Sequence, residues 1–245
     1  MRVHANLPLM RAAYQMRGTL LLAFMLLAVS CVVREAPVQQ GAVLPELLPG
    51  APLMSDAVAL AVDPEESRLI LRVYRAGPLA RFGHNHVITG PVHGEIRAGS
   101  GVQDSAFHLE IPVETLTVDD PAARAAEGEP FAGVLSAEAR AGTRRNLLGA
   151  EVLDAASHPR IIIDAMRIEG SRQSPEVTAR VVLRGERRDV RFPAEVVEAD
   201  GLFIVNAAFR ILQSDFGMRP FSVLGGGLSV ADEIDVRLRL VAVAE

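Results

Sequence analysis

Long stretches of this chain alternate between apolar and polar residues with a period of two, and no other feature constrains its fold as strongly. In residues 233–241 the apolar side chains fall at every second position, as Ile234, Val236, Leu238 and Leu240, with charged residues between them. Successive side chains of a strand point to opposite faces, so this pattern predicts strands with one buried face. Alternating or continuously apolar runs also occupy residues 67–74, 107–113, 161–168, 177–183, 190–197 and 202–212. The sequence therefore predicts an antiparallel, half-buried sheet.

Turn signals separate these runs and divide the chain into strands. Glycine-containing turns are expected at residues 184–186, 199–201 and 225–227. Residues 121–153 differ, because they are rich in alanine, glutamate and arginine and predict one or two short helices. About seven or eight strands with one helical insertion predict an all-β barrel or sandwich. A closed barrel of about eight strands either fills with side chains or holds an apolar ligand.

The first 30 residues have the pattern of a signal peptide. Residues 19–29 form an apolar run of 11 residues that follows Arg2, Arg11 and Arg17. A membrane-spanning helix needs about 20 apolar residues, so the run predicts a cleaved export signal rather than a transmembrane helix. Residues 1–30 contain no acidic residue, so their removal leaves a chain more acidic than the net charge of −5 of the whole sequence.

The only cysteine, Cys31, follows this segment directly. Its context, residues 28–31 (AVSC), resembles a bacterial lipobox, in which the cysteine is lipidated and becomes the new N-terminus. We therefore expect an exported, periplasmic protein that a lipidated Cys31 anchors to a membrane surface. The alternative is a plain secretory signal with an unmodified Cys31. The proline-rich residues 31–56 predict an extended tether, which leaves residues 57–245 for the folded domain.

Composition excludes several classes of function. The chain has no lysine, whereas a P-loop, a protein kinase and a pyridoxal-phosphate enzyme each need one. The Asp215-Phe216-Gly217 string is therefore structural rather than kinase-like. One cysteine excludes an intramolecular disulfide and a cysteine-rich metal site. The 30 acidic against 25 basic residues disfavour a nucleic-acid partner. No nucleophile elbow or Ser–His–Asp context supports a hydrolase.

Three stretches of the chain carry the motifs of a known family. Residues 67–94 (SRLILRVYRAGPLARFGHNHVITGPVHG) combine an opening strand with a Gly-His segment and a turn into a second strand. Residues 147–163 predict a short helix that ends at a His-Pro step, and the hairpin at 184–186 precedes residues 213–236 (QSDFGMRPFSVLGGGLSVADEIDV). In this order and spacing the stretches resemble the YceI-like family of bacterial periplasmic lipid-binding proteins. The resemblance implies a lipocalin-like, extended eight-stranded antiparallel β-barrel with a short helical insertion.

Members of that family are similar to carriers that hold a polyisoprenoid or another long-chain amphiphile in an apolar tunnel. The resemblance thus implies a binding protein without a cofactor, rather than an enzyme, whose partner is an apolar lipid or isoprenoid. Arg219, with the glycine loop at 225–227, could contact an anionic head group at the barrel mouth. The side chains expected to line the tunnel could instead fill a solid core. They are Leu71, Val73, Leu109, Ile111, Val181, Leu183, Phe209, Ile211, Val236 and Leu238.

A second hypothesis concerns the histidines of residues 83–86 (GHNH). In a strand, side chains at i and i+2 share a face, so His84 and His86 could together bind zinc, copper or nickel. His93 could complete the site after the turn that precedes it. The protein would then be a metal- or haem-handling redox accessory. The alternative is a structural role, in which one histidine bonds a backbone carbonyl near a strand end and the others lie on the surface.

Overall fold

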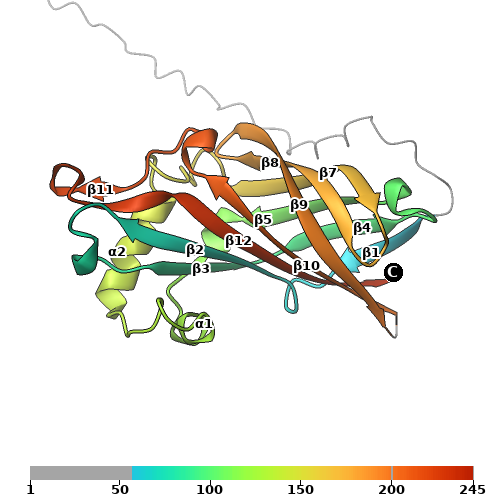
Figure 1. Cartoon of the computed structure of the whole chain (residues 1–245), viewed down its shortest axis with the longest axis horizontal. Helices are drawn as coiled ribbons and strands as arrows, with labels where there is room; N and C mark the ends of the chain where they lie inside the picture. Colours follow the sequence, from blue (N-terminus) through green and yellow to red (C-terminus); the bar gives the residue numbers. More distant parts are fainter. Residues whose placement is uncertain (1–56, 200, 245) are drawn as a thin grey trace, which may run out of the picture. The chain divides into compact units, whose positions relative to one another are not determined.

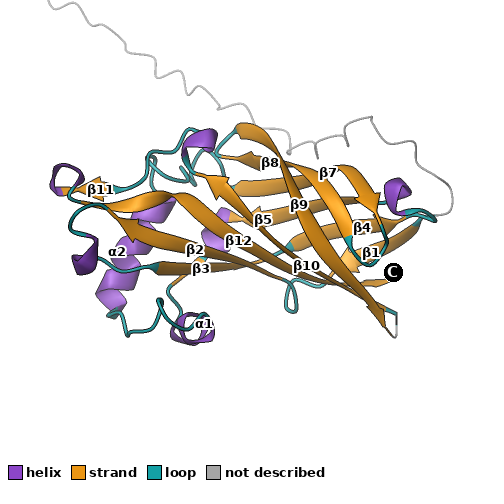
Figure 2. Cartoon of the chain, in the orientation of Figure 1, coloured by secondary structure: helices purple, strands orange, loops and turns teal. Residues whose placement is uncertain are grey.

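The apolar positions of the alternating segments line the inside of a closed β-barrel of eight antiparallel strands (Figures 1 and 2). The structure, a computed structural model, describes residues 57–199 and 201–244. Two short α-helices and several 3₁₀ turns are inserted between the strands. The expected all-β, lipocalin-like barrel with a helical insertion is confirmed.

The elements follow one another with short connections, apart from the segment that holds the helices. The helices are α1 (Pro121–Ala126) and α2 (Ala137–Leu148). The 3₁₀ turns are η1 (Ala80–Phe82), η2 (Val102–Asp104), η3 (Val113–Thr115), η4 (Ser214–Phe216) and η5 (Leu224–Gly226). The strands are β1 (Val58–Val62), β2 (Arg68–Ala76), β3 (His86–Pro91), β4 (His93–Ala98), β5 (Ala106–Pro112), β6 (Thr117–Val118), β7 (Arg160–Gly170), β8 (Pro175–Leu183), β9 (Glu186–Ala199), β10 (Leu202–Leu212), β11 (Ser222–Val223) and β12 (Leu228–Ala244).

The barrel has only eight strand positions, although the chain has more strands than that, because three positions are each shared by two strands. From β1 the order around the barrel is β4, β5, β7, β8, β9, β10 and β12, and β12 pairs with β1 to close it. Strands β2, β3 and β6 continue the positions of β1, β4 and β5 toward the end of the barrel that carries α2 (Figure 1). The short β11 pairs with the start of β12.

Strand β12, with 17 residues, forms the seam of the barrel. One of its edges pairs with β10 along the full length of that strand. The other edge pairs first with β2 and then with β1, where Leu60 lies opposite Ala244. Between β1 and β2, the buried Ser67 bridges to β12, because its Oγ accepts from the N–H of Val241 at 2.9 Å and donates to the carbonyl of Val241 at 3.3 Å. These two hydrogen bonds therefore fix the break between β1 and β2 to strand β12.

The sequence pattern predicts the longer strands well. β10 has the predicted bounds of 202–212, and β5, β7, β8, β9 and β12 contain most of the other predicted runs. Both helices lie within residues 121–153, where one or two were expected. The pattern does not predict β1, β4 and β6, because these strands are short and lack a clean apolar–polar alternation.

The turn between β8 and β9 shows how local chemistry sets the register. Arg184 and Gly185 have φ values of 54° and 78°, the left-handed pair that a two-residue type I′ hairpin needs. A Cβ on Gly185 would lie 2.8 Å from Cε1 of His158. Glycine is therefore required here both by its backbone conformation and by the close approach of the imidazole.

Helix α2 lies at one end of the barrel (Figure 1). Its N-terminus is capped by Ser136, whose Oγ accepts from the N–H of Ala139 at 3.2 Å. On its outer side Arg144 donates to the backbone carbonyl of Glu114 at 2.7 Å. These contacts fix the helix so that its inner side forms part of the wall of the barrel interior.

Candidate functional site: the barrel interior

The barrel interior is hollow in two places. A first cavity of about 180 Å³ lies at the α2 end, and a second of about 100 Å³ lies toward η2 and the connection between β9 and β10. The walls of both consist mainly of aliphatic and aromatic side chains contributed by the inward faces of the strands. The transfer of an apolar ligand from water into such a space is favourable.

The structure places every residue that the sequence predicts as lining on the wall of one of the two cavities. Contact of these side chains with a ligand stays a prediction. Leu109 and Leu238 line the second cavity. The first cavity is lined by Leu71, Val73, Ile111, Val181, Leu183, Phe209, Ile211 and Val236.

A pair of stacked rings lies where the two cavities meet. Phe209 lines the first cavity and Phe192 the second, and their ring centroids are 4.4 Å apart with planes inclined by 13°. The Ile163 side chain borders both cavities. The two spaces therefore belong to one apolar interior that the two phenylalanines divide.

The first cavity has a small polar region at the α2 end. It is formed by His86, Thr143 and Asn146, together with Gln213, whose Nε2 donates to the carbonyl of Ala231 at 2.7 Å. No aspartate, glutamate or arginine side chain lines this cavity. The wall can therefore form hydrogen bonds with a ligand but offers no side chain of fixed charge.

His86 connects this wall to a buried ion pair. Its Nδ1 lies 2.6 Å from Oδ2 of Asp119, which is fully buried. Oδ1 of Asp119 accepts from the backbone N–H of Val87 at 2.9 Å and from Nη1 of the buried Arg124 at 2.6 Å. Burial alone would raise the pKa of Asp119, but the hydrogen bonds from His86, Val87 and Arg124 outweigh burial and lower it.

The ionised Asp119 determines which ring nitrogen of His86 carries the proton of the hydrogen bond between them. Because the carboxylate can only accept, Nδ1 of His86 donates its proton to it. Nε2 has no hydrogen-bond partner among the residues that the structure describes. In the neutral imidazole this nitrogen is an acceptor, so it suits a ligand group that donates an O–H or N–H.

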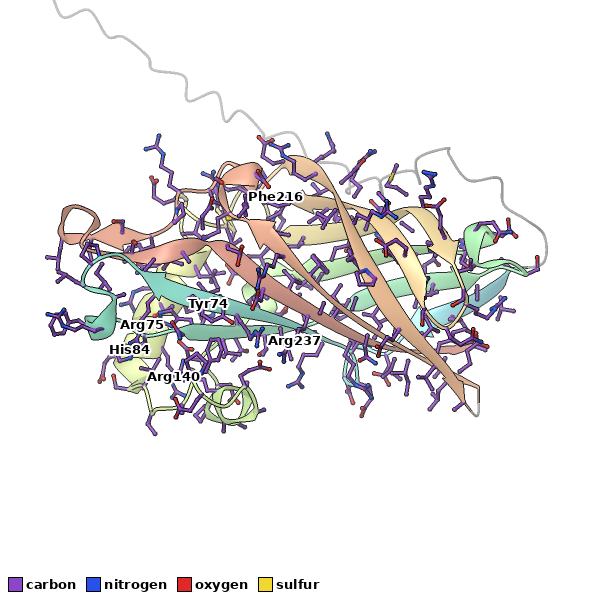
Figure 3. All side chains as sticks on the ribbon, in the orientation of Figure 1. Tyr74, Arg75, His84, Arg140, Phe216 and Arg237 are labelled. Atoms are coloured by element: carbon purple, nitrogen blue, oxygen red, sulfur yellow. The ribbon has the colours of Figure 1, made fainter. Side chains whose placement is uncertain are left out.

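A second polar network lies on the outer face of the barrel and secures α1. Arg72 and Tyr74 donate to Oδ2 of Asp235 at 2.7 and 2.9 Å, and Arg237 donates to Glu127, at the end of α1, at 2.9 Å. Figure 3 shows Tyr74 and Arg237 on β2 and β12. None of these five side chains lines either cavity, so the network stabilises α1 and does not contact a ligand inside the barrel.

The other predicted site residues lie outside both cavities. His84 is exposed in the loop before β3, and His93 is exposed at the start of β4. Strand β3 begins at His86, so the rule that residues i and i+2 share a face does not apply to His84 and His86. Across residues 57–199 and 201–244, no three histidine, cysteine, aspartate or glutamate side chains are grouped to hold a metal ion. Arg219 is exposed and lines neither cavity, and its contact with a head group stays a prediction.

Sequence reasoning does not identify Asp119 as the partner of His86. Asp119 and Asp120 both precede Pro121 and look alike as turn residues, but only Asp120 caps α1, by accepting from the N–H groups of Ala122 and Ala123. A helix start needs only one capping side chain, so the presence of two aspartates was the available signal that one of them has another partner.

Several predictions fall outside the part of the chain that the structure describes. They concern the signal peptide at residues 1–30, the tether at 31–56 and the lipidation of Cys31. Every helix in the described part is too short or too polar to span a bilayer.

Comparison with known proteins agrees with this architecture. The barrel is similar to BcnA from Burkholderia cenocepacia, with a TM-score of 0.52, 13% identity, and coverage of 74% of this chain and 98% of that one. It is also similar to a polyisoprenoid binding domain from Saccharophagus degradans implicated in plant cell wall breakdown, with a TM-score of 0.53, 13% identity, and coverage of 77% and 99%. At such identities the likeness shows the fold alone. A comparison with curated proteins gave no match. The sequence model of the YceI-like domain matches residues 60–242, nearly the whole barrel, and the chain therefore belongs to the YceI-like domain family.

Proposed function

We propose that this protein binds a long-chain apolar amphiphile, a polyisoprenoid or another lipid, inside its barrel and catalyses no reaction. The observation that carries the proposal is the pair of adjoining apolar cavities of about 180 and 100 Å³ in the barrel interior. Each methylene group moved from water into such a space contributes about 0.8 kcal/mol. Affinity for a long chain then needs no special residue.

The comparisons support this proposal without identifying the ligand. The Saccharophagus degradans domain, which has the same fold, is a polyisoprenoid binding domain. The cavities of this chain have the apolar walls that an isoprenoid requires.

The polar end of the ligand is proposed to lie at His86 and to be an uncharged hydroxyl group. In the neutral imidazole, the hydrogen bond from Nδ1 to Asp119 leaves Nε2 of His86 as an acceptor. The absence of arginine from the wall of the first cavity disfavours a carboxylate or phosphate there, because a buried anion needs a paired cation. A long-chain alcohol or phenol satisfies both conditions.

The site of action is proposed to be the cell envelope. The support is the sequence alone, namely the export signal at residues 1–30 and Cys31 in its lipobox-like context. Lipidation of Cys31 would anchor the barrel to a membrane surface through the tether at residues 31–56.

The binding proposal is tested with the purified full chain. Mass spectrometry of an organic extract should show a co-purified lipid, and the neutral probe N-phenyl-1-naphthylamine should fluoresce on uptake. Ile211→Trp fills the first cavity and should reduce uptake, whereas Leu212→Trp, which changes the neighbouring outward-facing residue, should not. Circular dichroism confirms that both variants fold. No extracted lipid and no uptake of the probe, or equal effects of both variants, would exclude the proposal.

The head-group assignment is tested by displacing the same probe with dodecanol, dodecanoate and dodecane. Dodecanol should bind most tightly, by roughly three- to tenfold over dodecane, which is the value of one neutral hydrogen bond. His86→Phe should remove this preference while it leaves dodecane binding in place. Tighter binding of dodecanoate than of dodecanol would show that the site is built for an anion.

A further inference from the structure

Two loops at the α2 end of the barrel form one surface, which we call the tip and define as residues 77–84 and 217–227. They lie side by side at the end of the barrel where Figure 1 labels β11, which belongs to the second segment. The N–H of Leu79 donates to the carbonyl of Gly227 at 2.8 Å, and a Cβ on Gly77 would lie 2.7 Å from that same oxygen. The two loops therefore pack backbone against backbone.

The tip exposes four large apolar side chains. Phe82 is 65% exposed and Leu224 is 74% exposed, and Phe221 and Val223 are exposed beside them. A single exposed apolar residue is ordinary, but a cluster rimmed by polar groups marks a binding surface. Leu224 also has a φ of 53°, a left-handed conformation that costs a non-glycine residue free energy and that no burial of its side chain offsets here.

The tip is basic although the chain as a whole has a net charge of −5. It carries Arg81, His84 and Arg219 and contains no acidic residue. The guanidinium of Arg81 lies 4.4 Å from the centre of the Phe82 ring, so a cation and an apolar group project together. Figure 3 shows His84 at this end of the barrel.

The tip is continuous with the first cavity. Phe221 is exposed at the surface and also lines that cavity, together with Met218 from the same loop. A partner that covers the tip would therefore lie against the rim of the ligand space.

We propose that the tip docks on an anionic lipid bilayer, with Phe82 and Leu224 entering the interface and Arg81 and Arg219 contacting lipid phosphates. Apolar side chains interleaved with arginines, without acids, match the layered chemistry of acyl chains beneath negative head groups. Docking in this way places the rim of the first cavity against the membrane. The proposal requires neither lipidation of Cys31 nor any particular ligand in the barrel.

The absence of tryptophan from the chain allows a direct test. Leu224→Trp places a single indole at the tip, and Val197→Trp places one at an exposed site on β9, near the opposite end of the barrel. Phosphatidylcholine vesicles with and without phosphatidylglycerol are added to the full-length variants. We expect a blue shift and quenching by brominated lipid for Leu224→Trp with the anionic vesicles, and no change for Val197→Trp.

Charge is tested with a matched pair of double variants. Arg81→Gln with Arg219→Gln should weaken vesicle binding of the Leu224→Trp protein by roughly 25-fold, since each basic residue near an anionic surface contributes about fivefold. Arg68→Gln with Arg239→Gln removes two exposed arginines from the outer face of the barrel and should have little effect. Added salt should weaken binding of the parent.

Three results would overturn the proposal. The first is vesicle binding without a change at Leu224→Trp, which would place the contact elsewhere, such as in residues 1–56. The second is an equal change at both indoles, which shows nonspecific adsorption. The third is a blue shift at Leu224→Trp that grows with protein concentration in the absence of vesicles, which would make the tip a contact between copies of this chain. Probe uptake by the barrel is unaffected by any of these outcomes, so the binding function is judged separately.

Discussion

Replacing Asp119 with asparagine should destabilise the barrel by about 3 kcal/mol. The carboxylate is fully buried and accepts hydrogen bonds from His86, Val87 and Arg124. Asparagine keeps the size of the side chain and tolerates the φ of 54° at this position. It removes the charge that compensates Arg124, whose side chain is only 5% exposed. Removal of one partner from a buried pair costs about 3–5 kcal/mol, and the carbonyl oxygen that asparagine retains puts this change at the lower end.

The neighbouring substitution Asp120→Asn is the matched control. Oδ1 of Asp120 accepts from the N–H groups of Ala122 and Ala123 at 3.0 Å, and asparagine caps a helix as well as aspartate does. Urea unfolding followed by circular dichroism gives the free energy of unfolding of each variant. Asp120→Asn should stay within about 0.5 kcal/mol of the parent. In a thermal melt, Asp119→Asn should lower the Tm by roughly 6–12 °C for a domain of this size.

The pH dependence gives a second check. The pKa of Asp119 in the folded protein lies below its ordinary value of 3.8, so the stability that it contributes is complete above that pH. It is lost as the pH falls through the folded pKa. Parent and Asp119→Asn should therefore converge in stability in acid. A cost below about 1 kcal/mol at neutral pH, or equal costs for Asp119→Asn and Asp120→Asn, would refute the role assigned to the buried carboxylate.

Three further perturbations test other parts of the barrel. Burial lowers the pKa of His108, but hydrogen bonds to two carboxylates outweigh burial and raise the pKa above 6.5. The stability that His108 contributes is therefore complete below pH 6.5 and is lost as the pH rises through the folded pKa. His108→Gln should flatten the decline of Tm above pH 6.5, and an unchanged slope would contradict this. Gly185→Ala should cost more than the roughly 1–2 kcal/mol of left-handed strain expected for Gly201→Ala, because only Gly185 has His158 within 4 Å; equal melting temperatures would count against the contact. Phe209→Ala should join the two cavities. In the parent, each added methylene of an n-alkyl alcohol should tighten binding roughly fourfold up to a limiting chain length, and the variant should continue this gain to longer chains. The same limiting chain length in the parent and the variant would rule this out.

The sequence predicts most of the barrel because its strands are long and one face of each is buried. Pro175–Leu183 shows this best, since buried positions alternate with partly exposed ones along the whole strand. The polar part of the site is different. The contact between His86 and Asp119 joins positions 33 residues apart, and it depends on where β3 begins and on how β6 leads into α1. Local pattern contains neither fact, so two nearby histidines resembled a metal site.

The seam along β12 has a consequence for how the molecule is made. Ser67 and Val241, which meet there, are separated by 174 positions. A chain that emerges from the ribosome cannot pair β1 and β2 with their barrel neighbour until β12 has been synthesised, and closure over such a distance is slow. In the meantime β1 and β2 expose an unpaired edge, which invites association with other unfinished chains. Strand β12, which follows every other strand of the barrel in the sequence, thus decides whether the chain becomes a barrel or an aggregate.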